Sequence, residues 1–143
     1  MRRLIHIFSA FLVIFTLIPL QPSAEMTQEE LYQKRMELYQ FIEKVTHIPW
    51  NYIAAVDQYE RNIRYVRNDL PKPTGLTGIY FPPEKWSGAL NPNQEDTNPM
   101  SIQFFGGMGR DGDGDGKAEP TNDVDVLYSF ATYLLDYGTD HDS

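Results

Sequence analysis

The sequence predicts a mainly helical domain, and three amphipathic segments separated by one proline-rich stretch carry this prediction. Apolar residues recur at helical spacing near residues 28–46, 50–62 and 123–137. Residues 68–99 contain six prolines, so we expect a mostly irregular excursion that folds back to line a cleft. Sheet should be minor, at most a short pairing around residues 79–81 or 102–104.

Composition restricts the classes of function. The chain has 143 residues, enough for one domain, and 41% of them are hydrophobic. It contains no cysteine, which excludes disulfides, a thiolate nucleophile and cysteine-ligated zinc. A formal net charge of -8 argues against nucleic acid as a partner.

Residues 1–24 have the order of a secretory signal peptide. Arg2 and Arg3 precede an apolar run over residues 4–20, and Ala24 offers a small residue for cleavage. The alternative is an uncleaved membrane anchor through residues 4–20. In either case we expect a secreted or cell-envelope protein, with residues 25–143 forming the domain.

Local signals set the helix ends. Thr27 and Glu30 have the spacing of a capping box, and His47 reads as a turn residue before the second helix. Arg61, Arg64 and Arg67 recur every three residues near the end of the second helix, and we interpret them as a solvated basic stripe with ordinary ion pairs. The candidate core residues on the three helices are Leu31, Leu38, Phe41, Ile42, Val45, Trp50, Ile53, Ala54, Val56, Val126, Leu127, Phe130, Ala131, Leu134 and Leu135.

The segment that follows residue 110 has the first half of an EF-hand calcium loop. Asp111, Asp113 and Asp115 alternate with glycine, and a further glycine occupies the sixth position, where the chain must turn sharply. The carbonyl of Lys117 would supply the seventh-position ligand. Asn122 stands where a standard loop has glutamate.

Two residues after the loop complete this prediction. Asn122 can cap the third helix, and Asp125 is the next carboxylate able to close the coordination shell. We therefore expect Ca²⁺ as the cofactor, bound by the carboxylates of Asp111, Asp113, Asp115 and Asp125 and by the Lys117 carbonyl.

Three blocks resemble the lysozyme-like domain of lytic murein transglycosylases, particularly the membrane-bound B-type subfamily. They are IPWNYIAAVDQYER, PMSIQFFGG and GRDGDGDGKAEPTNDVDVLYSFATYLLDYG. The resemblance implies a lysozyme-like fold and peptidoglycan as partner. It places Glu60 as the catalytic acid, and Gln103, Phe104 and Tyr59 as substrate-binding residues.

The chemistry of that family uses one acid. A single glutamate protonates the leaving oxygen of the MurNAc–GlcNAc bond and then accepts the proton as a 1,6-anhydro ring closes, so the second carboxylate of ordinary glycosidases is not needed. The chain departs from the family at Arg61, where a serine or threonine is usual. It also stops before the helix that completes the far wall of the cleft, so we expect a truncated domain.

Residues 34–140 are also similar to the amino-terminal region of sporulation L-Ala–D-Glu endopeptidases of Bacillus-type bacteria. Those proteins carry a downstream zinc peptidase domain of the M23 family, whose motifs are absent here. Three hypotheses remain open. They are an exported lytic transglycosylase, a non-catalytic peptidoglycan-binding module or fragment of a cell-wall endopeptidase, and a calcium-binding surface protein unrelated to the wall.

Overall fold

Five helices make up the computed structural model, which describes residues 25–138. They are α1 (Gln28–Thr46), α2 (Trp50–Val66), α3 (Pro83–Trp86), α4 (Pro99–Phe104) and α5 (Asp123–Gly138). The part of the chain described contains no strand, so the mainly helical prediction is confirmed. The suggested strand pairing is wrong, because residues 102–104 lie within α4 and residues 79–81 are irregular.

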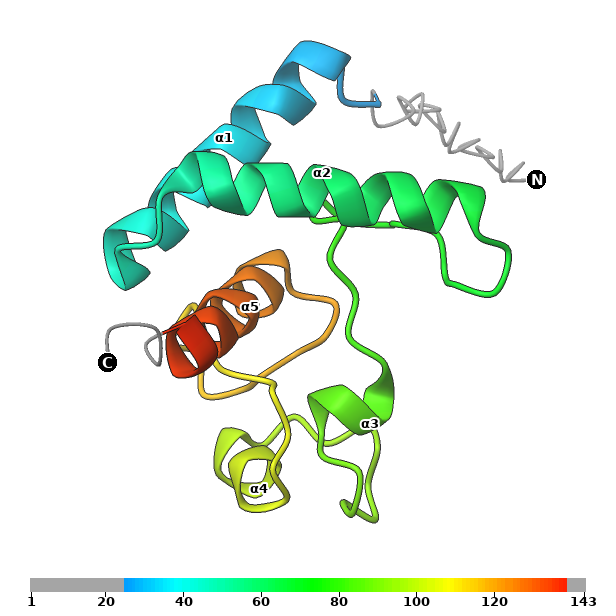
Figure 1. Cartoon of the computed structure of the whole chain (residues 1–143), viewed down its shortest axis with the longest axis vertical. Coiled ribbons are helices and arrows are strands. Elements are labelled where there is room, and N and C mark those ends of the chain that lie inside the picture. The colour runs from blue at the N-terminus through cyan, green and yellow to red at the C-terminus, as the bar shows by residue number, and fades with distance from the viewer. Residues whose placement is uncertain (1–24, 139–143) are drawn as a thin grey trace, which may run out of the picture.

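Helix α1 crosses α2 and also packs against α5 (Figure 1). The predicted capping box is present at its start, with the Thr27 hydroxyl accepting from the Glu30 backbone N–H and the Glu30 carboxylate accepting from the Thr27 N–H. The helix ends at Thr46 and is capped by His47, whose φ of 62° is left-handed, as expected of a turn residue. The turn leads directly into α2.

The hydrophobic core lies between these three helices and the excursion that follows α2. Several predicted core positions lie nearer the surface, because Phe41, Val45 and Trp50 are 41%, 45% and 37% exposed. The buried apolar residues are Leu38, Tyr39, Ile42, Ile53, Ile79, Trp86, Ile102, Ala118, Val126, Leu127 and Ala131.

A buried carboxylate on α2 fixes the course of the excursion. Asp57 is fully buried and accepts hydrogen bonds from the Tyr39 hydroxyl at 2.7 Å and the Thr77 hydroxyl at 2.6 Å. The backbone N–H groups of Gly78 and Ile79 also donate to it. These bonds satisfy a charge that would otherwise be costly to bury, and they hold residues 77–79 against α2.

The interpretation of the α2 arginines as a solvated stripe is wrong for two of the three. Arg61 is 4% exposed and forms an ion pair with Asp57 at 2.7 Å, while Arg64 is 7% exposed and donates to the carbonyls of Pro71 and Gly78. The carbonyl acceptors for both side chains come from the excursion, so the local sequence pattern of α2 could not predict that these arginines are buried. Only Arg67 is exposed, paired with Asp69.

Helix α4 forms where the sequence suggested irregular chain or a strand. The Asn98 side chain accepts from the backbone N–H groups of Met100 and Ser101, and Pro99 occupies the first helical position, where its missing N–H costs nothing. The helix lies far from α2, on the opposite side of α5 (Figure 1).

No helix within residues 25–138 combines the length and the apolar character that a membrane span requires. The signal-peptide and membrane-anchor predictions both concern residues 1–24, which lie outside the described residues.

Candidate functional site

Glu60 lies in a pocket between α2, α5 and the excursion. The side chain is half-buried and lines a cavity of about 460 Å³. The excursion contributes Tyr80 and Phe81, and α5 contributes Phe130 and Tyr133. The predicted cleft with aromatic walls is therefore present around Glu60, at a volume typical of small-molecule sites.

The other residues predicted to bind substrate do not line this pocket. Gln103 is exposed on α4, and Phe104 is 83% exposed beside it. Tyr59 is 63% exposed and does not line the pocket of its neighbour Glu60. The structure therefore does not bring Gln103 and Glu60 into one cavity, because α5 and residues 105–110 separate α4 from α2.

Arg61 is buried and does not line the Glu60 pocket. Its guanidinium points into the core, where Nη2 donates to Asp57 and to the Leu76 carbonyl, and its buried Nε has no hydrogen-bond partner within residues 25–138. Asp57 thus holds the guanidinium on the side of α2 that faces α1 and the excursion. The pocket around Glu60 does not include it.

The acidic loop gathers three of its predicted metal ligands. Asp111, Asp113 and Asp115 each offer a carboxylate oxygen, and these atoms lie within 4.8 Å of one another. Asp111 also accepts from the N–H groups of Gly114 and Gly116, whose φ angles of 81° and 91° suit only glycine comfortably. The loop is thus shaped so that its side chains converge.

The two remaining predicted ligands differ in their surroundings. Lys117 is exposed, and its N–H donates to Asp115 at 2.8 Å. Asp125 is fully buried and accepts from the N–H groups of Gly112 and Glu119, each at 2.8 Å, so it ties both ends of the loop to α5. It lies outside the cluster of three carboxylates.

Electrostatics at the loop favour a cation. Burial raises the pKa of the Asp125 carboxyl, and the charges of Asp113 and Asp111 raise it further, while its two backbone hydrogen bonds act in the opposite direction. None of these acids has an ion pair within the described chain. The donor set is all oxygen, which is the chemistry that Ca²⁺ prefers, and water can complete its six to eight ligands.

Asn122 and Asp123 each make a long-range contact that the sequence patterns did not predict. Asn122 caps α5 as predicted, accepting from the Val124 N–H at 3.0 Å, and its amide also donates to Asp113 at 2.7 Å. Asp123 accepts from the N–H groups of Leu76 and Thr77. The start of α5 therefore links the acidic loop to the excursion that walls the Glu60 pocket.

Comparison with known proteins finds one similarity that covers nearly the whole chain. The chain is similar to the L-Ala–D-Glu endopeptidase of Bacillus subtilis (strain 168), with 51% identity over 137 residues, or 96% of this chain. The chain spans 42% of the length of that curated relative. No family model and no solved structure matches the chain.

Proposed function

We propose that this chain is an extracytoplasmic module that binds peptidoglycan and serves a cell-wall endopeptidase. The observation that carries the proposal is the 51% identity to an L-Ala–D-Glu endopeptidase over nearly the whole chain. The L-Ala–D-Glu bond belongs to the peptide stem of peptidoglycan. The Glu60 pocket, with its aromatic walls, offers a place for the sugars to stack.

Sedimentation with purified peptidoglycan tests this proposal. The chain should pellet with insoluble sacculi and stay in solution without them. Phe81→Ala removes one aromatic wall and should weaken binding, whereas Phe104→Ala, an equal truncation at an exposed position outside the pocket, should not. Equal binding by both variants would place the contact elsewhere, and no pelleting of the wild type would refute the proposal.

A second candidate is lytic transglycosylase activity, favoured by the position of Glu60. A half-buried carboxyl among aromatic rings is suited to general-acid catalysis, and Arg61 is turned away from it. Gln103 does not line the pocket, so this candidate rests on Glu60 and its walls.

Product masses after digestion of peptidoglycan distinguish the two candidates. An active Glu60 predicts 1,6-anhydromuramoyl ends from the wild type and from Glu43→Gln, a matched change on α1, but none from Glu60→Gln. Anhydro ends from all three proteins would eliminate Glu60 as the acid. Sacculus binding without such ends would exclude transglycosylase activity and leave peptidoglycan binding as the function.

We also propose that the acidic loop binds one Ca²⁺ ion. Asp111, Asp113 and Asp115 would hold the ion, with the Lys117 carbonyl and Asp125 as further oxygen donors. The support is that three carboxylates converge in this loop and form no ion pair within residues 25–138. The ion would neutralise this cluster and thereby stabilise the start of α5 and the contacts that Asp123 makes to the excursion.

A further inference from the structure

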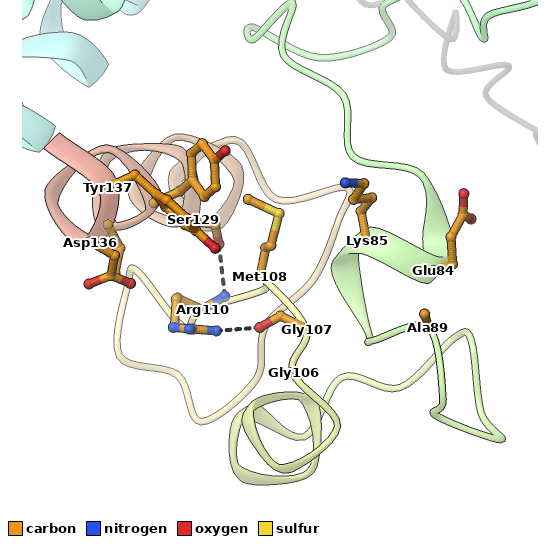
Figure 2. A pocket seen from close by; sticks show the side chains of 12 residues that line it. Glu84, Lys85, Ala89, Gly106, Gly107, Met108, Arg110, Ser129, Asp136 and Tyr137 are labelled. Carbon is orange, nitrogen blue, oxygen red and sulfur yellow. Dashed lines mark hydrogen bonds between the residues drawn. The ribbon is translucent and has the colours of Figure 1, made fainter.

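A second cavity adjoins the Glu60 pocket and has a different chemical character. It encloses about 400 Å³ between α3, residues 106–110 and the outer face of α5 (Figure 2). Lys85, Met108 and Tyr133 line both cavities. The two cavities are therefore neighbouring compartments that share part of their walls.

Arg110 presents an open hydrogen-bonding edge in this second cavity. Its Nη1 donates to the carbonyls of Gly107 at 2.8 Å and Gly109 at 3.0 Å, and its backbone N–H donates to the Ser129 hydroxyl at 2.8 Å (Figure 2). These bonds fix the side chain in place. Nε and Nη2 have no hydrogen-bond partner within residues 25–138. Together they form the fork that matches both oxygens of a carboxylate.

The remaining charges define what this fork can accept. Lys85 also lines the cavity, and the ion pairs within residues 25–138 involve neither cation. Glu84 and Asp136 line the cavity too, so it is electrically mixed. These acids disfavour a dianion such as phosphate, because they add repulsion without adding donors. Planar carboxylates spaced along a peptide fit better than a compact dianion, because each carboxylate can meet one of the two cations.

Aromatic surface completes the cavity. The rings of Tyr133 and Tyr137 pack with centroids 4.5 Å apart, one turn apart on α5. They give the cavity an apolar wall on α5, against which the carbon skeleton of a ligand can lie.

We propose that this cavity binds the acidic peptide stem of peptidoglycan, with a stem carboxylate on the Arg110 fork and a second one near Lys85. The inference rests on the proposed peptidoglycan binding and deepens it. Sugars occupy the compartment of Glu60, and the peptide attached to them enters the compartment of Arg110. The shared residues Met108 and Tyr133 lie at the junction.

Calorimetric titration with the L-Ala–D-Glu dipeptide tests the proposal. The purified chain should bind this dipeptide, and amidation of both carboxylates should abolish binding. Arg110→Gln and Lys85→Gln should each weaken binding at least about tenfold, as expected for loss of a charge-assisted contact. Lys44→Gln, the same change on α1 outside both cavities, should bind like the wild type.

The Lys85 variant distinguishes a loss of ligand contacts from a loss of folded structure. Arg110 also holds the 107–109 loop, so Arg110→Gln can alter the fold. The Lys85 side chain makes no hydrogen bond or ion pair within residues 25–138, and the bonds that Lys85 does make come from its backbone, which Lys85→Gln leaves in place. Undiminished dipeptide binding by Lys85→Gln with an unchanged melting curve, or equal binding of the amidated dipeptide, would overturn the inference. Sacculus sedimentation without dipeptide binding would refute the peptide-stem inference and leave peptidoglycan binding standing. Dipeptide binding without sedimentation would support the dipeptide site at Arg110 and Lys85 and would refute binding to intact peptidoglycan.

Discussion

The buried Asp57–Arg61 pair gives the sharpest test of how α2 holds the excursion in place. In Asp57→Asn the amide can keep one oxygen for Thr77 and the backbone of residues 78–79, but its NH₂ group must face the guanidinium of Arg61. Both groups are donors, and the guanidinium is left buried without a counter-charge. Removing one partner of a buried pair costs about 3–5 kcal/mol of the free energy of unfolding.

For a domain of this size that loss lowers the melting temperature by about 10 °C or more. Urea denaturation followed by circular dichroism measures the free energy. Asp69→Asn is the matched control, because it breaks the exposed pair with Arg67 and should leave the melting temperature unchanged.

A double-mutant cycle isolates the pair itself. Arg61→Met in the Asp57→Asn background removes the stranded charge, and the Leu76 carbonyl keeps its bond from Arg35, so the double variant should regain most of the lost stability. Additive losses in the cycle, or an Asp57→Asn variant as stable as the Asp69 control, would show that the buried pair does not hold the excursion against α2.

Three further predictions concern the loop, a close backbone contact and a buried phenol. Ca²⁺ at a hundredfold excess over its dissociation constant should stabilise the chain by ~2.7 kcal/mol in calorimetric melting, and Asp113→Ala should remove that response; an unmoved wild-type curve would contradict the calcium proposal. Gly78→Ala should cost about 1–3 kcal/mol, because a Cβ there would lie 2.5 Å from the Asp57 carbonyl oxygen, while Gly138→Ala meets nothing within 4 Å and should be neutral. Burial, reinforced by the charge of Asp57, raises the pKa of Tyr39 above its ordinary value of 10.0, so the stability it contributes is present below pH 10 and is lost as the pH rises further. Tyr39→Phe should flatten that alkaline loss in melting experiments, and an equally steep loss in the variant would exclude Tyr39 as its source.

The sequence predicted the long helices well, because their apolar spacing and caps are local properties. Helix α2 runs one turn beyond the expected end at residue 62, since Arg64 is buried by carbonyls of the excursion rather than solvated. Helix α4 has only six residues, too few for periodicity to reveal.

The site residues divide in the same way, into features set by nearby residues and features set by distant ones. Alternating aspartates and a glycine predicted the carboxylate cluster, because its geometry is set within five residues. The open edge of Arg110 and the burial of Asp57 depend on partners far away in the chain, which no local pattern reports. The expected meeting of Glu60 with Gln103 relied on a resemblance to a family rather than on spacing, and the structure places them apart.

Chemical-shift mapping by NMR tests most directly whether the joined cavities are the peptidoglycan site. A muramoyl peptide fragment, which carries both sugar and stem, is titrated into the isotope-labelled chain. This assignment of the site predicts the largest changes at the backbone amides of Lys85, Met108 and Tyr133, where the two cavities meet, with smaller ones at Glu60 and Arg110. Changes confined to α1 or to α4, with these amides unmoved, would contradict it.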